Sequence, residues 1–182
     1  PAAGTFMIRV WGNELAEARR VTFEVEGEAL APDAVGRRLE GVRLSNDYYT
    51  VDTNGVCTHG GDSATIIADL SAGQIIGGVA TAVPTGFHKA IEGVPAWNYT
   101  FEPDQARLPA IREAADGVVG LQAALWIAPE YNAVMLYEVR LDVEDAHILW
   151  ADEAVSGTLR LRYELEPDAL REPPNISIPN GC

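Results

Sequence analysis

The sequence predicts an all-β protein: a single-domain antiparallel β-sandwich or jelly roll with one short helix and an extended C-terminal arm. Alternating apolar and polar residues recur along most of the chain, and glycine, asparagine and proline clusters separate the alternating segments. Apolar residues make up 47% of the 182 residues, which is enough material for one substantial core. We therefore expect a β-sandwich domain over residues 1–166 and a proline-rich arm over residues 167–182.

The first third of the chain supplies four strands. Thr5 to Trp11 forms the first, and VTFEVEGEAL (residues 21–30) alternates most clearly, with its valines and phenylalanine on one face. RRLEGVRLS (residues 37–45) and YYTVDT (residues 48–53) follow, separated by the turn signal Asn46-Asp47. Asn54-Gly55 then gives a stronger turn signal, because both residue types tolerate positive φ.

The middle of the chain is less regular. SATIIADL (residues 63–70) and GQIIGGVATAV (residues 73–83) are nearly continuous apolar runs, which predict strands covered on both faces. Together they have the length of a membrane span, but Asp69 and the break at residues 71–73 favour two buried strands joined by a turn. Residues 84–109 are rich in proline, glycine and aromatic residues and are expected to form a long, ordered excursion from the sheet.

A helix is expected only in PDQARLPAIREAAD (residues 103–116), beginning near Pro109, since proline suits the first helical position. Alternation then returns in four segments: GVVGLQAALWI, AVMLYEVRLDV, HILWA and VSGTLRLRYELEP. In the last of these, Leu159, Leu161 and Tyr163 face one way and Arg160, Arg162 and Glu164 the other. The tail after it carries Pro173, Pro174 and Pro179, which keep it extended and out of sheet pairing.

The charge balance excludes one class of partner. The chain has 27 acidic and 13 basic residues, a net charge of −14, and Lys89 is its single lysine. Such a surface repels phosphate backbones, so we expect no direct nucleic-acid binding. An acidic, lysine-poor surface is typical of adaptation to high salt, although GC-rich codon usage gives part of the same pattern. The first residues lack a basic region followed by an apolar run, so no secretory signal is expected.

Motifs for catalysis are weak. Ser63 lacks the G-x-S-x-G frame of a nucleophile elbow, and the three histidines, His59, His88 and His147, do not cluster. Cys57, His59 and Asp62 lie close together in sequence, but closed zinc sites use four ligands and no second ligand pair exists. We therefore expect no enzyme activity, no cofactor and no metal site.

Trp97 and Tyr99, in the segment VPAWNYTF, are the candidate residues for ligand binding. Aromatic side chains in a glycine- and proline-rich loop of a sandwich are typical of a carbohydrate-binding or adhesion module. The structural alternative is that they fix the loop to the core. Asn98 and Asn175 begin N-glycosylation tripeptides, which we expect to be unoccupied.

The two cysteines allow three arrangements. Cys182 can bond Cys57, both thiols can be free, or Cys182 can bond a neighbouring subunit while Cys57 stays buried. An internal bond would close a loop of about 125 residues and contribute on the order of 4–5 kcal/mol in the chain-entropy model. An extended arm from Pro173 to Cys182 spans roughly 30 Å at about 3.1 Å per residue, and this reach favours the intersubunit bond.

The chain resembles the smaller major capsid protein of icosahedral, internal-membrane haloarchaeal viruses and related thermophilic phages. The resemblance rests on its length, its strand pattern, its acidic lysine-poor composition and the terminal Cys182. The capsids of these viruses use upright single jelly rolls. The resemblance implies a structural virion protein located in the capsid. It also implies that this protein pairs with copies of itself and with a larger jelly-roll coat protein in pseudo-hexameric capsomers. Any relation to the underlying virion membrane would be indirect, and disulfides would tie capsomers together.

Two other functions remain open. One is an extracellular β-sandwich module for carbohydrate binding or adhesion that uses Trp97 and Tyr99. The other, weaker one is a jelly-roll enzyme of cupin type, which needs clustered metal-ligand histidines that the sequence does not show. An internal Cys57–Cys182 bond would remove the main support for the coat protein and favour the binding module.

Overall fold

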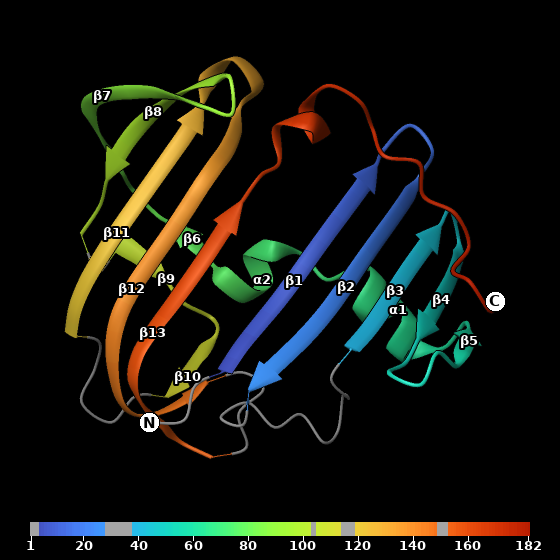
Figure 1. Ribbon diagram of the computed structural model, residues 1–182. Helices are drawn as coiled ribbons and strands as arrows, with labels where there is room; N and C mark the ends of the chain where they lie inside the picture. The colour runs from blue at the N-terminus through green and yellow to red at the C-terminus, as the bar shows by residue number, and fades with distance from the viewer. Residues whose placement is uncertain (1–3, 28–37, 103–104, 114–118, 149–152) are drawn as a thin grey trace. The chain divides into compact units, whose positions relative to one another are not determined.

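The computed structural model describes residues 4–27, 38–102, 105–113, 119–148 and 153–182 (Figure 1). Antiparallel strands dominate these residues, so the predicted all-β class is confirmed. The described chain forms two compact units. Unit 1 contains residues 4–27, 38–72 and 173–182, and unit 2 contains residues 73–102, 105–113, 119–148 and 153–172. The division into a sandwich over residues 1–166 and an arm over residues 167–182 stays a prediction.

Unit 1 is a five-stranded antiparallel sheet whose strands pair in chain order. Its strands are β1 (Gly4–Asn13), β2 (Ala18–Gly27), β3 (Arg38–Leu44), β4 (Asp47–Val51) and β5 (Cys57–His59). The four strands predicted for this part of the chain are thus confirmed within the described residues; residues 28–30 and 37 of those predictions lie outside them. The turn between β3 and β4 lies at Ser45-Asn46, one residue earlier than predicted, and Ser45 adopts a φ of 52°. Gly55 has a φ of 77°, as its turn signal indicated.

Helix α1 (Asp62–Ala68) packs against the sheet of unit 1. Ala64 and Ala68 are buried one helical turn apart, and the glycine at position 41 of β3 makes room for the last turn of α1. A Cβ atom on Gly41 would lie 2.6 Å from Ile67 Cγ2 and 2.9 Å from the Ala68 backbone nitrogen. The predicted buried strand over residues 63–70 is therefore wrong, because this contact selects a helix from a run of apolar residues that suits either structure.

Residues 173–182 lie against unit 1. Asn13 Nδ2 donates a hydrogen bond of 3.0 Å to the Pro174 carbonyl, and Pro179 is buried. The chain end is fixed by a disulfide between Cys57 and Cys182, whose Cα atoms lie 5.4 Å apart. The preference for an intersubunit bond at Cys182, with Cys57 as a buried thiol, is therefore wrong. The extended tail brings Cys182 to Cys57 of the same chain.

Unit 2 contains a six-stranded antiparallel sheet in the order β10-β12-β11-β8-β7, with β13 also paired to β12. Its strands are β7 (Val83–Ile91), β8 (Val94–Thr100), β10 (Ile111–Glu113), β11 (Val119–Ala128), β12 (Ala133–Ile148) and β13 (Val155–Glu164). Strand β12 joins two segments that were predicted as separate strands, and Asp145, with a φ of 49°, lies at the irregularity between them. The 3₁₀ helix η2 (Pro129–Tyr131) connects β11 to β12.

The core of unit 2 contains larger side chains than that of unit 1. One cluster comprises Phe101, Leu125, Tyr137, Val139, Leu141, Val143 and Ala146, and a second comprises Val94, Ala96, Ala128 and Met135. Ile76 of α2 (Ala72–Ile76) and Val79 of β6 (Gly78–Val79) pack on the first cluster, and Leu170 of η3 (Pro167–Leu170) packs on the second. The predicted alternation in β13 is confirmed, since its arginines are exposed and its leucines half-buried.

Two further predictions for unit 2 are wrong. Residues 73–83 do not form one buried strand, because Gly77 has a φ of 77° and ends α2 after a single turn. The helix predicted from Pro109 is absent from residues 105–113, which form β9 (Ala106–Arg107), a turn and β10 instead. Residues 103–104 and 114–116 of that prediction lie outside the described residues. No helix in the described part of the chain is long and apolar enough to cross a membrane.

Candidate interaction surface

Strands β7 and β8 form a hairpin at one end of the unit 2 sheet (Figure 1). Its two-residue turn, Glu92-Gly93, has φ angles of 46° and 85°, and positive φ at both positions is what a type I′ turn requires. The expected excursion over residues 84–109 is therefore wrong. Pro84 and Pro95 obscured the strand pattern; Pro84 lies in the edge strand β7, where proline is tolerated.

A bulge in β7 shapes the outer strand of this hairpin. Pro84 pairs with Tyr99 and His88 with Trp97, so β7 advances four residues while β8 advances two. Within the bulge, Thr85 Oγ1 donates a hydrogen bond of 2.9 Å to Asn98 Oδ1 and accepts one of 3.3 Å from the Phe87 backbone nitrogen. The backbone of this segment is thereby fixed although its side chains are exposed.

The hairpin exposes large apolar side chains. Phe87 is 72% exposed, Val83 59% and Trp97 43%. The His88 ring lies beside Trp97, with ring centroids 5.1 Å apart and planes tilted by 37°. His88 and Trp97 are cross-strand partners and share one face of the hairpin, whereas Val83 pairs with Thr100, three positions from Trp97, and lies on the other face. We call the exposed residues Val83, Phe87, His88 and Trp97, which cover both faces of the hairpin, the hairpin surface. Exposed apolar side chains that gather on one element are typical of sites where a partner binds.

The structure separates the two aromatic residues that the sequence singled out. Trp97 belongs to the hairpin surface, whereas Tyr99 is half-buried and packs on the core cluster that contains Phe101 and Leu125. Tyr99 thus packs on the core as the structural alternative expected, and Trp97 is the more exposed of the two rings. A role of Trp97 and Tyr99 in ligand binding stays a prediction. Sequence reasoning missed Phe87 and His88. Counting outward from a turn at Glu92-Gly93 would have placed His88 opposite Trp97.

The remaining sequence candidates take part in no shared site. Cys57 is in a disulfide and has no thiolate to offer a metal, and His59 stacks on Tyr49 and lies 3.5 Å from Asp47 Oδ1. Ser63 is exposed in the first turn of α1, and His147 is exposed near the end of β12. Among the described residues, no three histidine, cysteine or acidic side chains gather as a metal site would require.

The two glycosylation tripeptides differ in their surroundings. Asn98 lies within β8, where its side-chain amide donates a hydrogen bond of 3.3 Å to the Leu125 carbonyl. Asn175 lies exposed in the C-terminal segment. That both positions are unoccupied stays a prediction.

Unit 1 has a polar hollow of about 500 Å³ whose lining includes Glu17, Arg19, Arg43 and Tyr48. Arg19, Arg43 and Tyr48 bond to Leu70 and Asp69 just after α1, and Glu17 accepts a hydrogen bond from Ser45. Arg19 Nη2 donates to the Leu70 carbonyl, and Arg43 Nη1 lies 2.7 Å from Asp69 Oδ1. Burial, followed by repulsion from Arg43, lowers the pKa of Arg19. The cluster acts as a structural tie between the sheet and α1.

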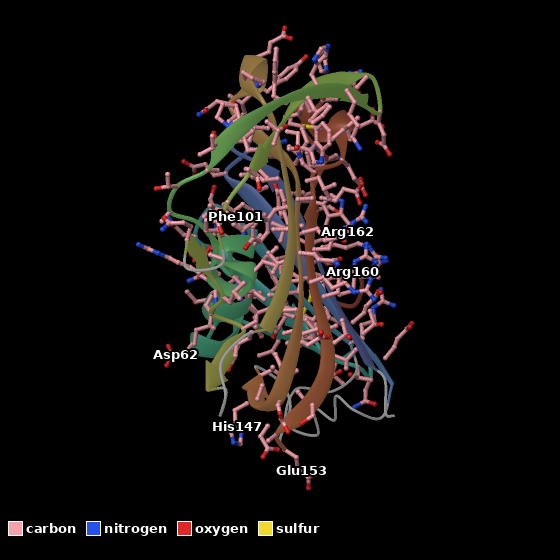
Figure 2. The ribbon with its side chains drawn as sticks, turned by 90° about the vertical axis from the view of Figure 1, so that its left-hand side faces the viewer. Asp62, Phe101, His147, Glu153, Arg160 and Arg162 are labelled. Atoms are coloured by element: carbon pink, nitrogen blue, oxygen red, sulfur yellow. A yellow bond between two sulfur atoms is a disulfide. The ribbon has the colours of Figure 1, made fainter. Side chains whose placement is uncertain are left out.

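The outer face of β12 and β13 carries a ladder of charges. Glu138 accepts hydrogen bonds of 2.6 Å from Arg160 and 3.2 Å from Arg162, and Arg162 also bonds Glu164 at 2.7 Å. Arg160 and Arg162 project from the same side of β13, whereas Phe101 lies on the opposite side of the sheet (Figure 2). The hydrogen bond from Arg160 lowers the pKa of Glu138 and raises that of Arg160. Exposed pairs of this kind stabilise a fold only weakly.

No protein-family model, no curated protein and no solved structure matches this chain. Its described residues form an all-β protein with an exposed aromatic hairpin and a disulfide at the chain end.

Proposed function

We propose that this protein is a structural virion protein, a capsid subunit that acts by self-association and pairs with a larger jelly-roll coat protein. The observation that carries this proposal is the hairpin surface. Phe87 and Val83 are more than half exposed on a backbone that hydrogen bonds hold in place. A rigid, exposed apolar surface suits a contact with another protein, because little order is lost when the partner binds.

The charge of the chain supports assembly in high salt. Copies that each carry a net charge of −14 repel one another at low ionic strength. Screening shortens the range of this repulsion from about 10 Å at 0.1 M salt to about 3 Å at 1 M salt. Apolar contacts such as those of the hairpin surface would then determine whether the copies associate. The same charge argues against direct contact with nucleic acid or an anionic membrane surface, so any relation to a virion membrane is indirect.

The disulfide supports a location outside a reducing compartment, such as a virion surface. It does not supply the link between capsomers that the resemblance implied, because Cys182 is bonded to Cys57 of the same chain. Under this proposal the bond stiffens the subunit instead, and contacts between subunits are non-covalent.

A carbohydrate-binding or adhesion module is the second candidate function. It is favoured by the internal disulfide and by Trp97, an exposed aromatic ring with the polar His88 beside it. It is weakened by the packing of half-buried Tyr99 on the core, which leaves less of the second ring exposed than of Trp97. Sugar binding also needs polar groups that orient hydroxyls, whereas Phe87 and Val83 are apolar. The internal disulfide removes the covalent link between subunits that had favoured the coat protein, but the hairpin surface offers a non-covalent contact in its place, so we still rank the coat protein first.

Sedimentation velocity of the disulfide-intact chain at about 0.1 M and about 1 M salt tests the proposal. We expect larger species at high salt, and we expect Phe87→Ser to shift the distribution toward the monomer. Ile178→Ser is the matched control, because Ile178 is 51% exposed but lies in the C-terminal segment. A chain that stays monomeric at both salts and binds a glycan array, with loss of binding in Trp97→Ala, would establish the module instead.

A further inference from the structure

We propose that β1 is a second assembly surface, at which two copies of the chain pair antiparallel about a two-fold axis and join their unit 1 sheets. This inference rests on the proposed self-association and names one contact through which it takes place. It is independent of the hairpin surface, which belongs to unit 2.

Strand β1 is a long, regular edge. Among the described strands it pairs with β2 alone, and the register runs without interruption from Gly4↔Gly27 to Asn13↔Ala18. Its sequence, GTFMIRVWGN, contains no proline, and its ladder contains no bulge. An edge of this kind presents a row of backbone groups that a further strand can pair with.

The other edge strands carry features that oppose pairing. Strand β5 has only three residues and contains Cys57, which is held by the disulfide. Strand β7 contains Pro84 and a bulge, and β13 contains Gly157 and the charged ladder around Arg160. Short length, proline, bulges and charge are the usual means of protecting an edge. Among the long edge strands of the described sheets, β1 lacks all of these except the charge of Arg9, which Glu24 of β2 pairs at 2.9 Å.

The apolar row of unit 1 continues into β1, the edge strand of its sheet. Phe6, Ile8 and Val10 lie opposite Val25, Phe23 and Val21 of β2, and these three β2 side chains are at most 7% exposed. Phe6 and Phe23 have ring centroids 5.8 Å apart. By contrast, Val10 of β1 remains 40% exposed, as does Met7 on the other face. A further strand with apolar residues on the same face would cover Val10.

A second copy of β1 supplies such a strand. If Ile8 lies opposite Ile8 of the second copy, Phe6 faces Val10 on the apolar side, and Met7 faces Arg9 on the other. A shift that puts Arg9 opposite itself would bring like charges together. A slip of one residue would place the apolar row against the polar face. The register centred on Ile8 avoids both and keeps nearly the whole strand paired, and its two-fold symmetry closes the assembly at a dimer.

Cysteine cross-linking tests this register. In Ile8→Cys the two introduced thiols face each other within the Cα range of about 4.4–6.8 Å that a disulfide spans. In the control Val10→Cys each thiol faces Phe6, so the two thiols are offset along the strand by roughly 13 Å, at about 3.3 Å per residue. With the native disulfide intact and at high salt, mild oxidation should convert most of the Ile8→Cys monomer into a reducible dimer and leave Val10→Cys monomeric.

A variant without new thiols gives an independent measurement. Val10→Lys should remove the dimer in sedimentation velocity at high salt. Leu15→Lys, at a position that is 93% exposed in the turn after β1, should leave the dimer unchanged. Circular dichroism and a urea midpoint check that both variants fold.

The outcomes separate the two proposals. Salt-driven assembly of the wild type that survives Val10→Lys, with equal or no cross-linking of the two cysteine variants, would overturn the β1 contact and leave the coat-protein proposal standing. A wild-type chain that stays monomeric at every salt concentration would overturn both. Preferential cross-linking at position 8 together with loss of the dimer in Val10→Lys supports the inference.

Discussion

The two units of this chain stabilise their sheets by different means. The buried side chains of unit 1 are mostly small, and its large buried ring is Phe23. Unit 2 buries Leu125, Met135, Tyr137 and Leu141 between longer strands. Both cysteines lie in unit 1, where their bond fixes the chain end. A small core leaves little margin of stability, and a covalent closure compensates for it. The predictions below test this difference, beginning with the largest expected effect.

Cys182→Ser should destabilise unit 1 strongly. The native disulfide closes a loop with a sequence separation of 125 residues, which corresponds to on the order of 4–5 kcal/mol in the chain-entropy model when the whole loop unfolds, and to less when unit 2 stays folded. Hydrogen exchange followed by segment should show faster exchange in β4, β5 and residues 173–182. Exchange in β11 and β12 should stay unchanged. Asn180→Ser, an exposed neighbour, is the control, and equal acceleration in both units would contradict the proposed difference.

Gly41→Ala should cost about 2 kcal/mol, because the added methyl group would overlap Ile67 and the backbone of Ala68 and push α1 off the sheet. Urea denaturation measures this loss. Gly73→Ala in α2 is the matched control, since a Cβ atom there meets nothing within 4 Å and alanine favours a helix. We expect Gly73→Ala to be neutral or slightly stabilising. Equal losses in the two variants would show that the α1 contact is not tight.

Tyr137→Phe should stabilise unit 2 by about 1 kcal/mol. The Tyr137 hydroxyl is buried and has no hydrogen-bond partner among the described residues, so its removal relieves a desolvation cost. Tyr131→Phe, at a 43% exposed position, should change little in the same urea denaturation. A destabilised Tyr137→Phe would indicate that the hydroxyl has a partner.

The same residue predicts an alkaline effect. Burial raises the pKa of Tyr137, so the folded state favours its neutral form. The stability that this preference contributes to the folded state is fully present below the ordinary tyrosine pKa of about 10. It is lost as pH rises from there through the higher pKa of Tyr137 in the folded state. Urea midpoints should therefore fall less steeply above about pH 10 in Tyr137→Phe than in the wild type.

Glu138→Gln should have the smallest effect, about 0.5 kcal/mol, because its arginine partners are exposed. The hydrogen bond from Arg160 lowers the pKa of Glu138. The stability that ionised Glu138 contributes is present above the ordinary glutamate pKa of about 4.3. It is lost as pH falls through the lower pKa of Glu138 in the folded state. Thermal unfolding at low salt should show a weaker acid dependence in Glu138→Gln and an unchanged one in Glu130→Gln. The same acid dependence of unfolding in Glu138→Gln and the wild type would show that the charge ladder does not contribute to stability.

Sequence patterns correctly predicted the strands with clear alternation. They gave the wrong secondary structure where contacts between distant residues determine it. In β2 and β13 each residue's face follows from local alternation, so both strands were found. The run TIIADL suits either a strand or a helix, and the choice depends on Gly41, which lies more than twenty positions earlier. Alternation within one segment carries no information about such a contact.

The candidate site was predictable in part. Trp97 was identified from its type and neighbourhood, but the burial of Tyr99 depends on packing with Phe101 and Leu125. The partner of Cys182 was misjudged for a similar reason. Chain length gives the reach of an extended tail, whereas the direction of that tail is set by contacts such as Asn13 with Pro174.

The bond between Cys57 and Cys182 also determines how the chain carries mechanical load. A pull between residue 1 and residue 182 passes through the first 57 residues and then across the sulfur atoms to the end. The residues between the two cysteines form a loop outside this path and bear no tension. Full extension would therefore stop at roughly 190 Å, at about 3.4 Å per residue, instead of roughly 620 Å for the open chain. Unit 2 would remain folded while β1 to β4 were drawn out.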